Sequence, residues 1–416
     1  MIPAVRSSAL GLSAALVLAV TACSGVAGNA RLADVEASGD GTLRIGVILD
    51  SSGEQSFLND AQQAAVELAV KDVNADGGHK GKPVELLATP SGDSASQARK
   101  LVDGKADVVV GPTDSANAPA AIDVLSRAGI TVISPANTAS ALTSYKSGGY
   151  YFRTAAADIA QAPVLVKLAK DTGAKSLAVI YQEGSYGEAV SEAVASVAGD
   201  SGLDTPVVVE FAPGKAADAA AKVRDADADA VVVIAREGSQ GVLAELKNAG
   251  IPGEKLLLSD GAFDQYGSGL ANGTLEGTRA VLPGNFPSAG FQDRLLSVDK
   301  GLKDLTFAAE SYDAVILAAL AAEAQKDDSG KSIAAGLISV SGGPVEGAAE
   351  RTACTSFADC RKLLASGKGA DYDGQSGPVA FDANGDITSA SYMTFTYGPD
   401  NKATLSGKES AARTND

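Results

Sequence analysis

The feature that most constrains this chain is an alternation of expected strands and helices that runs once and then starts again. Short apolar segments, which favour strands, alternate with segments whose apolar residues recur at helical spacing. The first set predicts strands over 43–49, 84–88, 107–110 and 130–133, separated by helices over 62–74, 94–102 and 117–127. The second set predicts strands over 176–181, 205–211, 230–235 and 255–259, which alternate with helices over 159–172, 186–198, 216–226 and 240–249. A further helix is expected over 311–325 and a further strand over 391–397.

The expected strands have the composition of parallel sheets. The runs 108–110 and 231–234 are continuously apolar, which is typical of strands covered on both faces. Strands that alternate with helices form α/β layers, and two consecutive sets predict two similar Rossmann-like lobes. Ligands of open α/β sheets bind beyond the carboxyl ends of the strands. We therefore expect a cleft between the lobes, lined by loops 50–58, 111–117, 134–138, 182–186, 236–239 and 260–263.

The N-terminus, residues 1–22, has the pattern of a signal peptide. Arg6 is its only charged residue, and an apolar run from Ala9 to Val20 follows. This run is shorter than the ~20 residues that span a bilayer and suits the core of a signal peptide. It leads into Val20-Thr21-Ala22-Cys23, which resembles the lipobox of bacterial lipoproteins, where the cysteine is acylated. We predict lipidation at Cys23; the alternative is an ordinary cleaved signal peptide with an incidental cysteine.

The small, polar residues 24–42 are predicted to form a flexible tether with a reach of roughly 25 Å. A domain on such a tether would be anchored by lipid alone and would work outside the cytoplasm, near the membrane surface. No later stretch of the sequence is long and apolar enough to span a membrane.

Two cysteines remain beyond the leader, Cys354 and Cys360. Export permits a disulfide, and the even number supports one. The chain-entropy model assigns such a short loop roughly 2 kcal/mol. We predict a local disulfide staple; two buried thiols are the alternative.

Two of the expected loops carry small hydroxyl residues ahead of helical segments. They are Gly111-Pro112-Thr113-Asp114-Ser115-Ala116 and Ser134-Pro135-Ala136-Asn137-Thr138. Free N–H groups at a helix N-terminus suit an anion such as a carboxylate. The same residue types are also the usual helix caps, so a purely structural role is the alternative. Asp260, just past an expected strand, either pairs with an ammonium group or is a turn aspartate.

Several segments together resemble the leucine/isoleucine/valine-binding group of type I periplasmic binding proteins, which bind branched-chain amino acids and amides. The resemblance covers residues from Leu43 to Tyr397. It is carried by 72–78 (DVNADGG), 133–138 (ISPANT), Phe152-Arg153-Thr154 followed by Asp158 and Gln161, and Tyr186-Gly187-Glu188.

The resemblance implies a two-lobed clamshell with three hinge crossovers that delivers a ligand to an ABC importer. Expected boundaries are 43–155 with 284–376 for the first lobe, 156–283 with 377–405 for the second, and 406–416 for a tail. The α-carboxylate site of the family matches Ser115, Ala136 and Thr138. Its ammonium acceptor matches Asp260, one methylene shorter than the usual glutamate, and its second-lobe tyrosine matches Tyr186.

The part of the site that would read the ligand side chain departs from the family pattern. Phe57 is the possible substitute for a first-loop aromatic residue, and Arg236, beside Glu237, stands where the family has a tyrosine. This charged pair either reads a polar or acidic ligand side chain or forms a salt bridge on the rim. Phe307, Glu310 and Tyr312 either border the cleft or belong to a helix packed in the first lobe.

Other function classes fit the sequence poorly. With 34 Lys and Arg against 51 Asp and Glu, the net charge of −17 argues against nucleic acid and against docking on anionic lipid. A catalytic triad would need His79, the single histidine, which lies in a glycine-rich loop away from the cleft. No His/Cys cluster has metal-ligand spacing, and we expect no enzyme activity, metal or cofactor. The expected partners of this monomer are a small ligand and a permease; a sensor that signals to a membrane receptor is the alternative.

Overall fold

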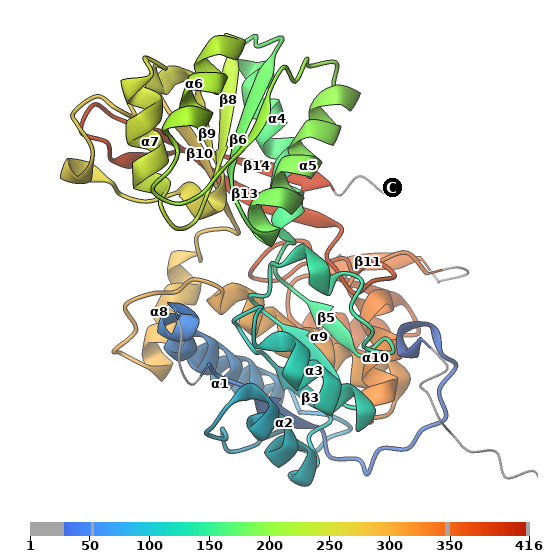
Figure 1. The fold of residues 1–416 in the computed structure, drawn as a ribbon. Helices are drawn as coiled ribbons and strands as arrows, with labels where there is room; N and C mark the ends of the chain where they lie inside the picture. Colours follow the sequence, from blue (N-terminus) through green and yellow to red (C-terminus); the bar gives the residue numbers. More distant parts are fainter. Residues whose placement is uncertain (1–28, 51–53, 346–349, 413–416) are drawn as a thin grey trace, which may run out of the picture.

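The two sets of strands form two sheets, one in each of two lobes that lie end to end (Figure 1). The structure, a computed structural model, describes residues 29–50, 54–345 and 350–412. The predicted fold class, two α/β lobes built on parallel sheets, is confirmed. The predicted signal peptide, residues 1–22, and Cys23 lie outside the described residues. Within the described residues, no helix has the length and apolar composition needed to cross a membrane.

The first lobe is built on a five-stranded parallel sheet in the order β2-β1-β3-β4-β5. Its strands are β1 (Arg44–Val47), β2 (Glu85–Leu86), β3 (Val108–Val110), β4 (Thr131–Ser134) and β5 (Tyr151–Arg153). One face packs against α2 (Ser94–Asp103) and α3 (Ala118–Arg127). The other packs against α1 (Asn59–Ala75), α9 (Ala308–Gln325) and α10 (Gly330–Val340). The alanine-rich α9 is buried on nearly all sides, as its lack of polar residues between Asp313 and Glu323 requires.

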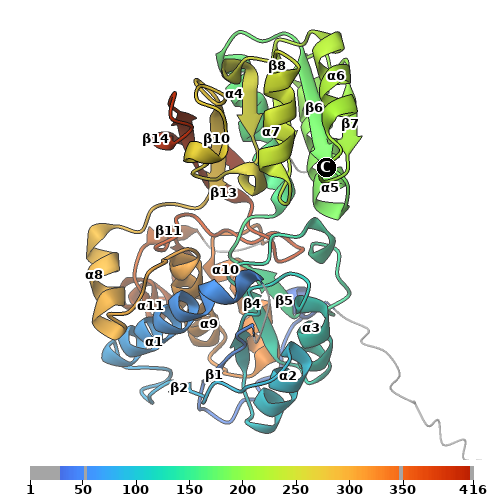
Figure 2. The same ribbon diagram turned by 60° about the vertical axis from the view of Figure 1, so that its left-hand side comes forward.

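The second lobe has a seven-stranded sheet in the order β14-β13-β10-β9-β8-β6-β7. Its strands are β6 (Leu177–Gln182), β7 (Val208–Phe211), β8 (Ala230–Ile234), β9 (Leu256–Leu258), β10 (Arg279–Pro283), β13 (Ser389–Tyr397) and β14 (Ala403–Ala412). Helices α4 (Ala162–Asp171) and α5 (Ser185–Asp200) cover one face, and α6 (Ala217–Ala226) and α7 (Ser239–Asn248) cover the other (Figure 2). Strands β13 and β14 are antiparallel, so the sheet is parallel except at this edge.

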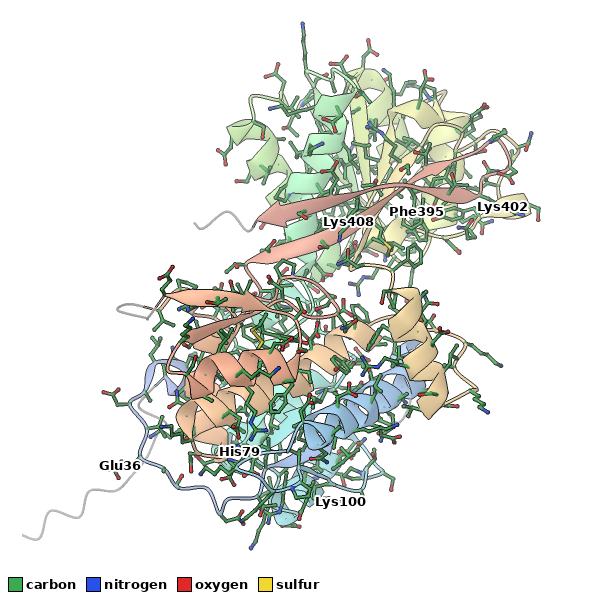
Figure 3. All side chains as sticks on the ribbon, turned by 180° about the vertical axis from the view of Figure 1, so that it is seen from behind. Glu36, His79, Lys100, Phe395, Lys402 and Lys408 are labelled. Carbon is green, nitrogen blue, oxygen red and sulfur yellow. A yellow bond between two sulfur atoms is a disulfide. The ribbon has the colours of Figure 1, made fainter. Side chains whose placement is uncertain are left out.

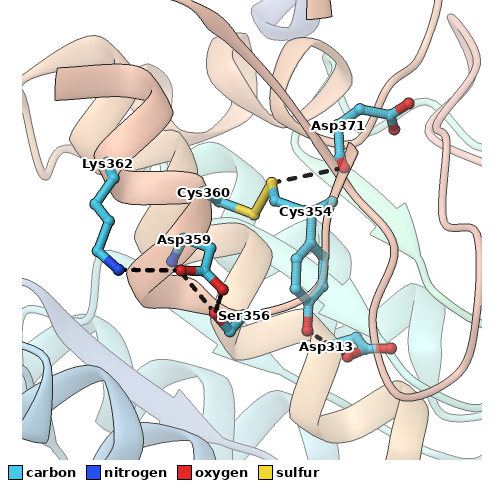
Figure 4. The surroundings of a disulfide bond; sticks show 8 residues. Asp313, Cys354, Ser356, Asp359, Cys360, Lys362 and Asp371 are labelled. Carbon is cyan, nitrogen blue, oxygen red and sulfur yellow. Dashed lines mark hydrogen bonds and ion pairs between the residues drawn. A yellow bond between two sulfur atoms is a disulfide. The ribbon is translucent and has the colours of Figure 1, made fainter. Parts of the chain in front are cut away.

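Four further elements complete the first lobe, and three of them surround the predicted disulfide (Figure 4). Strands β11 (Arg351–Cys354) and β12 (Gly369–Tyr372) form a parallel pair beside α11 (Phe357–Ala365), and α8 (Ala289–Val298) packs near α1. The Cys354–Cys360 disulfide joins β11 to α11. The disulfide staple is therefore present, and both cysteines are buried.

The chain passes between the lobes three times. The first crossover joins β5 to α4 through η4 (Asp158–Gln161), the second joins β10 to α8, and the third leads into β13. These connections bring the carboxyl ends of the strands of both sheets toward each other, which is where open α/β sheets bind ligands.

The prediction of a flexible tether over 24–42 is wrong for the described residues 29–42, which dock on the first lobe. The backbone N–H groups of Gly39 and Gly41 donate to Asp327 Oδ1 (2.9 Å) and Asp328 Oδ1 (3.0 Å). A Cβ atom at Gly39 would lie 2.4 Å from Asp328 Oδ1, so only glycine permits this approach. The small residues that indicate a linker by composition thus allow close docking.

Two predicted boundaries near the C-terminus are also wrong. Residues 377–388, expected in the second lobe, pack on the first: Phe381 is buried edge-on against Phe152, with ring centroids 5.2 Å apart. The expected tail begins inside a strand, because β14 continues to Ala412 and pairs with β13. Strand β5 was not predicted as a strand, since its three residues are too few to show a period.

Candidate ligand-binding site between the lobes

A cavity of about 400 Å³ lies between the lobes, at the ends of β3 and β4 in the first and β8 and β9 in the second. Five of the predicted site residues line it: Ser115, Ala136, Thr138, Arg236 and Asp260. Thr113, Asp114, Glu237, Gly261, Pro283 and Phe307 complete its walls. Four of the six predicted loops, 111–117, 134–138, 236–239 and 260–263, thus meet at the cavity, and no described residue of 50–58 or 182–186 is among those that line it.

Asp50, at the end of the first strand, holds the loop that carries Ser115. Its buried carboxylate accepts hydrogen bonds from the Thr113 hydroxyl, the Asp114 backbone N–H (2.8 Å) and the Asn117 side-chain amide (3.0 Å). The Ser115 hydroxyl oxygen accepts a bond from the Ala139 N–H at 3.3 Å. This network fixes the loop before α3 and leaves the Ser115 hydroxyl proton able to turn toward a ligand.

The second loop of the first lobe is fixed by Ser134 and Asp158. The Ser134 hydroxyl oxygen accepts from the N–H groups of Asn137 (3.0 Å) and Ala136 (3.3 Å). The Asp158 N–H donates to the Thr138 carbonyl oxygen at 2.7 Å. The longer bond to Ala136 is the weaker of the two, so this N–H group can exchange it for a ligand oxygen at little cost.

In the second lobe, Asp260 is held by two neutral donors. Its Oδ1 atom accepts hydrogen bonds from the Tyr186 hydroxyl (2.5 Å) and the Gln161 side-chain amide (2.7 Å). Gln161 also accepts a bond from the Asp260 N–H at 3.1 Å. Both side-chain bonds go to Oδ1, which orients the carboxylate and leaves Oδ2 to accept from a cation in the cavity.

Arg236 is positioned by a ring and a carboxylate. Its guanidinium carbon lies 4.1 Å from the centre of the Tyr186 ring, and Nη2 donates to Asp158 Oδ1 at 3.3 Å. The Asp158 side chain is only 4% exposed. Burial, followed by the charge of Asp260, raises the pKa of Asp158 to about 6, although Arg236 opposes the shift. The expected rim salt bridge between Arg236 and Glu237 is not the one formed: Arg236 pairs with the buried Asp158 instead.

Two predicted site residues take other positions. Phe57 is 56% exposed and is absent from the cavity walls, so its role in ligand binding stays a prediction. Its neighbour Leu58, in the same short 3₁₀ helix Glu54–Leu58, is buried. Tyr186 supports Asp260 and Arg236 rather than lining the cavity itself.

Some residues that shape the site were not predicted from the sequence. Asp158 and Gln161 were part of the quoted family pattern, which was the available signal, but neither was assigned a role. Phe307 borders the cavity, which is one of the two positions expected for it. Its backbone is left-handed (φ 59°), which is unusual for a bulky residue. Tyr312 is buried in the first-lobe core, and Glu310 lies beside the hinge.

His79, the histidine that a catalytic triad would need, does not line the cavity. His79 is buried in the first lobe, with Nδ1 2.8 Å from Glu323 Oε1 (Figure 3). Across 29–50, 54–345 and 350–412, no group of three or more His, Cys, Asp or Glu side chains could hold a metal ion. The cavity offers hydroxyl, N–H and carboxylate groups suited to binding a small polar molecule.

Comparisons with known proteins agree with this geometry. Residues 42–398 match the sequence family described as periplasmic binding protein. The chain is 29% identical over 364 residues to the chemotactic signal transduction system substrate-binding protein BasB of Halobacterium salinarum, covering 81% of this chain and 83% of that protein. It is 26% identical to Leu/Ile/Val-binding protein homolog 7 of Brucella suis over 50% of this chain, and this match spans little more than half (56%) of that relative.

The fold is also found in solved structures. The ABC transporter substrate-binding protein of Desulfitobacterium hafniense, in complex with Leu, superposes with a TM-score of 0.63. The alignment covers 88% of this chain and all of that chain at 21% identity. At that level of identity the likeness establishes the fold.

Proposed function

Because this chain belongs to the periplasmic binding protein family, we propose that it captures an amino acid or amide between its lobes and delivers it to an ABC importer. Family membership makes it an extracytoplasmic binding protein and not an enzyme. The observation that carries the proposal is the cavity, whose walls combine hydroxyl groups of one lobe with the oriented carboxylate of Asp260 on the other.

The first-lobe wall suits the carboxylate of a ligand. The hydroxyl groups of Ser115 and Thr138 and the N–H group of Ala136 line one side of the cavity. Neutral donors of this kind bind an anion without requiring a buried cation. We infer that the open protein first takes its ligand on this wall.

The second-lobe wall suits the ammonium group. Asp260 is fixed through Oδ1, so that Oδ2 is available for a charge-assisted hydrogen bond. A ligand with an anionic and a cationic end therefore touches both lobes, and it binds the closed arrangement more tightly than the open one. This difference in affinity shifts the population toward closure, which is the state that a permease would recognise.

The names of relatives support an amino acid as the ligand. The Brucella relative is named for binding leucine, isoleucine and valine, and the Desulfitobacterium structure contains leucine. The carboxylate of Asp260 favours a ligand with an ammonium group over a simple organic acid.

Sensing is the second candidate function, and one observation favours it. The Halobacterium relative, which covers most of this chain, is named as part of a chemotactic signal transduction system. Lobe closure serves a receptor as well as a permease. Deletion of the gene distinguishes the two, because only an importer is needed for uptake of the radiolabelled ligand.

We further propose that Cys23 carries a lipid anchor. The residues before it and its place after the apolar run support this. Cys23→Ser should move the protein from the membrane fraction to the soluble fraction of growing cells. Continued membrane association of this variant would contradict the anchor.

The binding proposal is tested by calorimetry of the purified protein with the common amino acids. Asp260→Asn should weaken binding of every amino acid about 10- to 100-fold, since a charge-assisted hydrogen bond contributes about 1.5–3 kcal/mol. Asp264→Asn, the same change at an exposed position four residues along the chain, is the matched control. Equal affinities of Asp260→Asn and the parent would refute the ammonium assignment.

A further inference from the structure

The charged groups around the cavity do not balance. Four charged side chains line it: Asp114, Arg236, Glu237 and Asp260. Three carboxylates therefore face one guanidinium. An amino acid with an uncharged side chain has no net charge, so its binding would not reduce this excess of negative charge.

Arg236 does not offset this excess, because its charge is shared between two aspartates: it forms an ion pair with the buried Asp158 and also interacts electrostatically with Asp260. Nη2 of Arg236 donates to Oδ1 and Oδ2 of the buried Asp158, at 3.3 and 3.5 Å. Asp158 lies behind the wall and not on it. With Asp158 counted, four carboxylates stand against one guanidinium, so the excess of negative charge remains.

None of these three carboxylates forms an ion pair with a lysine or arginine in the part of the chain that the structure describes. Asp260 accepts from Tyr186 and Gln161, and Asp114 accepts from the Ala116 N–H at 2.9 Å. These donors are neutral. Glu237 is exposed and has no hydrogen-bond partner among the described residues.

Asp114 and Glu237 belong to opposite lobes. Asp114 follows β3 of the first lobe and Glu237 follows β8 of the second, and both line the same cavity. Closing the cleft brings like charges together, and the water that screens them is expelled. A ligand cation between them removes this repulsion and favours closure.

We propose that the ligand carries a second cationic group, an ammonium or guanidinium on its side chain, which Asp114 and Glu237 bind from opposite lobes. The ligand class is thus a basic amino acid. This inference rests on the proposed function and deepens it: Asp260 takes the α-ammonium, and Asp114 and Glu237 select the side chain.

The experiment is calorimetry of the purified protein with L-lysine, L-leucine and L-glutamate at low ionic strength. Lysine should bind at least tenfold more tightly than leucine, and glutamate most weakly. Raising the salt concentration should weaken lysine binding more than leucine binding, because the extra contacts are ionic.

Glu237→Gln is the informative variant, because this exposed side chain has no structural partner to lose. It should lower the affinity for lysine about tenfold and should not lower that for leucine, because it also removes the repulsion between Glu237 and Asp114 that opposes closure; Asp114→Asn should act in the same direction. Glu192→Gln, which removes the same charge from an exposed position on α5, is the control.

The outcomes separate the two proposals. If leucine binds as tightly as lysine, or if Glu237→Gln leaves the preference unchanged, the second cationic site is refuted and the amino-acid function stands. If glutamate binds most tightly, Arg236 is the residue that binds the ligand side chain, and this inference is wrong. If no amino acid binds, the proposed function fails and this inference fails with it.

Discussion

Arg153, at the end of β5, and Asp386, in the segment before β13, form a buried, bidentate ion pair between residues that are 233 positions apart in the sequence. Arg153 Nε donates to Asp386 Oδ1 at 2.6 Å and Nη2 donates to Oδ2 at 2.8 Å. The same guanidinium donates through Nη1 to the carbonyl oxygens of Asn137 and Ala139, which flank Thr138. The pair thus joins the third crossover to the loop that carries part of the ligand site.

Asp386→Asn should lower the free energy of unfolding by about 3–5 kcal/mol, because it leaves the arginine charge buried without its partner. Urea denaturation followed by circular dichroism measures this. The double variant Arg153→Met/Asp386→Leu should recover part of the loss, since no uncompensated charge remains. A double variant less stable than Asp386→Asn would show that the cost lies in lost packing and not in the buried charge.

Tyr186→Phe should weaken amino-acid binding about tenfold with little change in stability. The variant keeps the ring beneath Arg236 but removes the hydroxyl that orients Asp260, and a hydrogen bond to a charged group contributes about 1.5–3 kcal/mol. Calorimetry gives the dissociation constant. Tyr181→Phe, on β6 of the same lobe and away from the cavity walls, is the control and should bind as the parent does.

The sequence predicted which loops form the cavity because the carboxyl ends of parallel strands converge whatever the side chains are. Ser115, Thr138 and Asp260 line the cavity for that reason. The sequence did not predict the partners of these residues. The ion pair of Asp158 with Arg236 depends on how η4 meets the loop after β8, 78 residues later in the chain.

Docking of the N-terminal arm was unpredictable for a similar reason. Composition makes residues 29–42 look like a linker, and their partners Asp327 and Asp328 lie more than 280 residues away. Of the neighbours Phe57 and Leu58, Leu58 is the buried one, and sequence patterns do not fix the ends of such short helical turns closely enough to predict this.

Removing the disulfide should lower stability and leave ligand binding unchanged. Cys354 and Cys360 close a short loop within the first lobe, away from the cavity walls, and the chain-entropy model gives such a loop about 2 kcal/mol. The variant is Cys354→Ser/Cys360→Ser, and its midpoint in urea should fall while its dissociation constant stays that of the parent. A loss of affinity would mean that β11 and α11 influence the cleft.

Glu310 should make the stability of the hinge depend on pH. Its side chain is buried beside all three crossovers, near Thr154, Gly284 and Ser376. Burial raises the pKa of this carboxyl from 4.5 to about 7, and the nearby Asp313 adds to the shift. Between these two values the folded protein holds a proton that the unfolded chain has released.

Raising the pH through this window therefore lowers the free energy of unfolding, by up to about 3 kcal/mol from this group alone. Glu310→Gln cannot ionise and loses this contribution. The stability of the variant relative to the parent should rise from pH 4.5 to pH 7 and become constant above it, as measured by urea denaturation at one-unit intervals. Parallel pH profiles of variant and parent would mean that Glu310 titrates normally, and that the hinge admits enough water to solvate its charge.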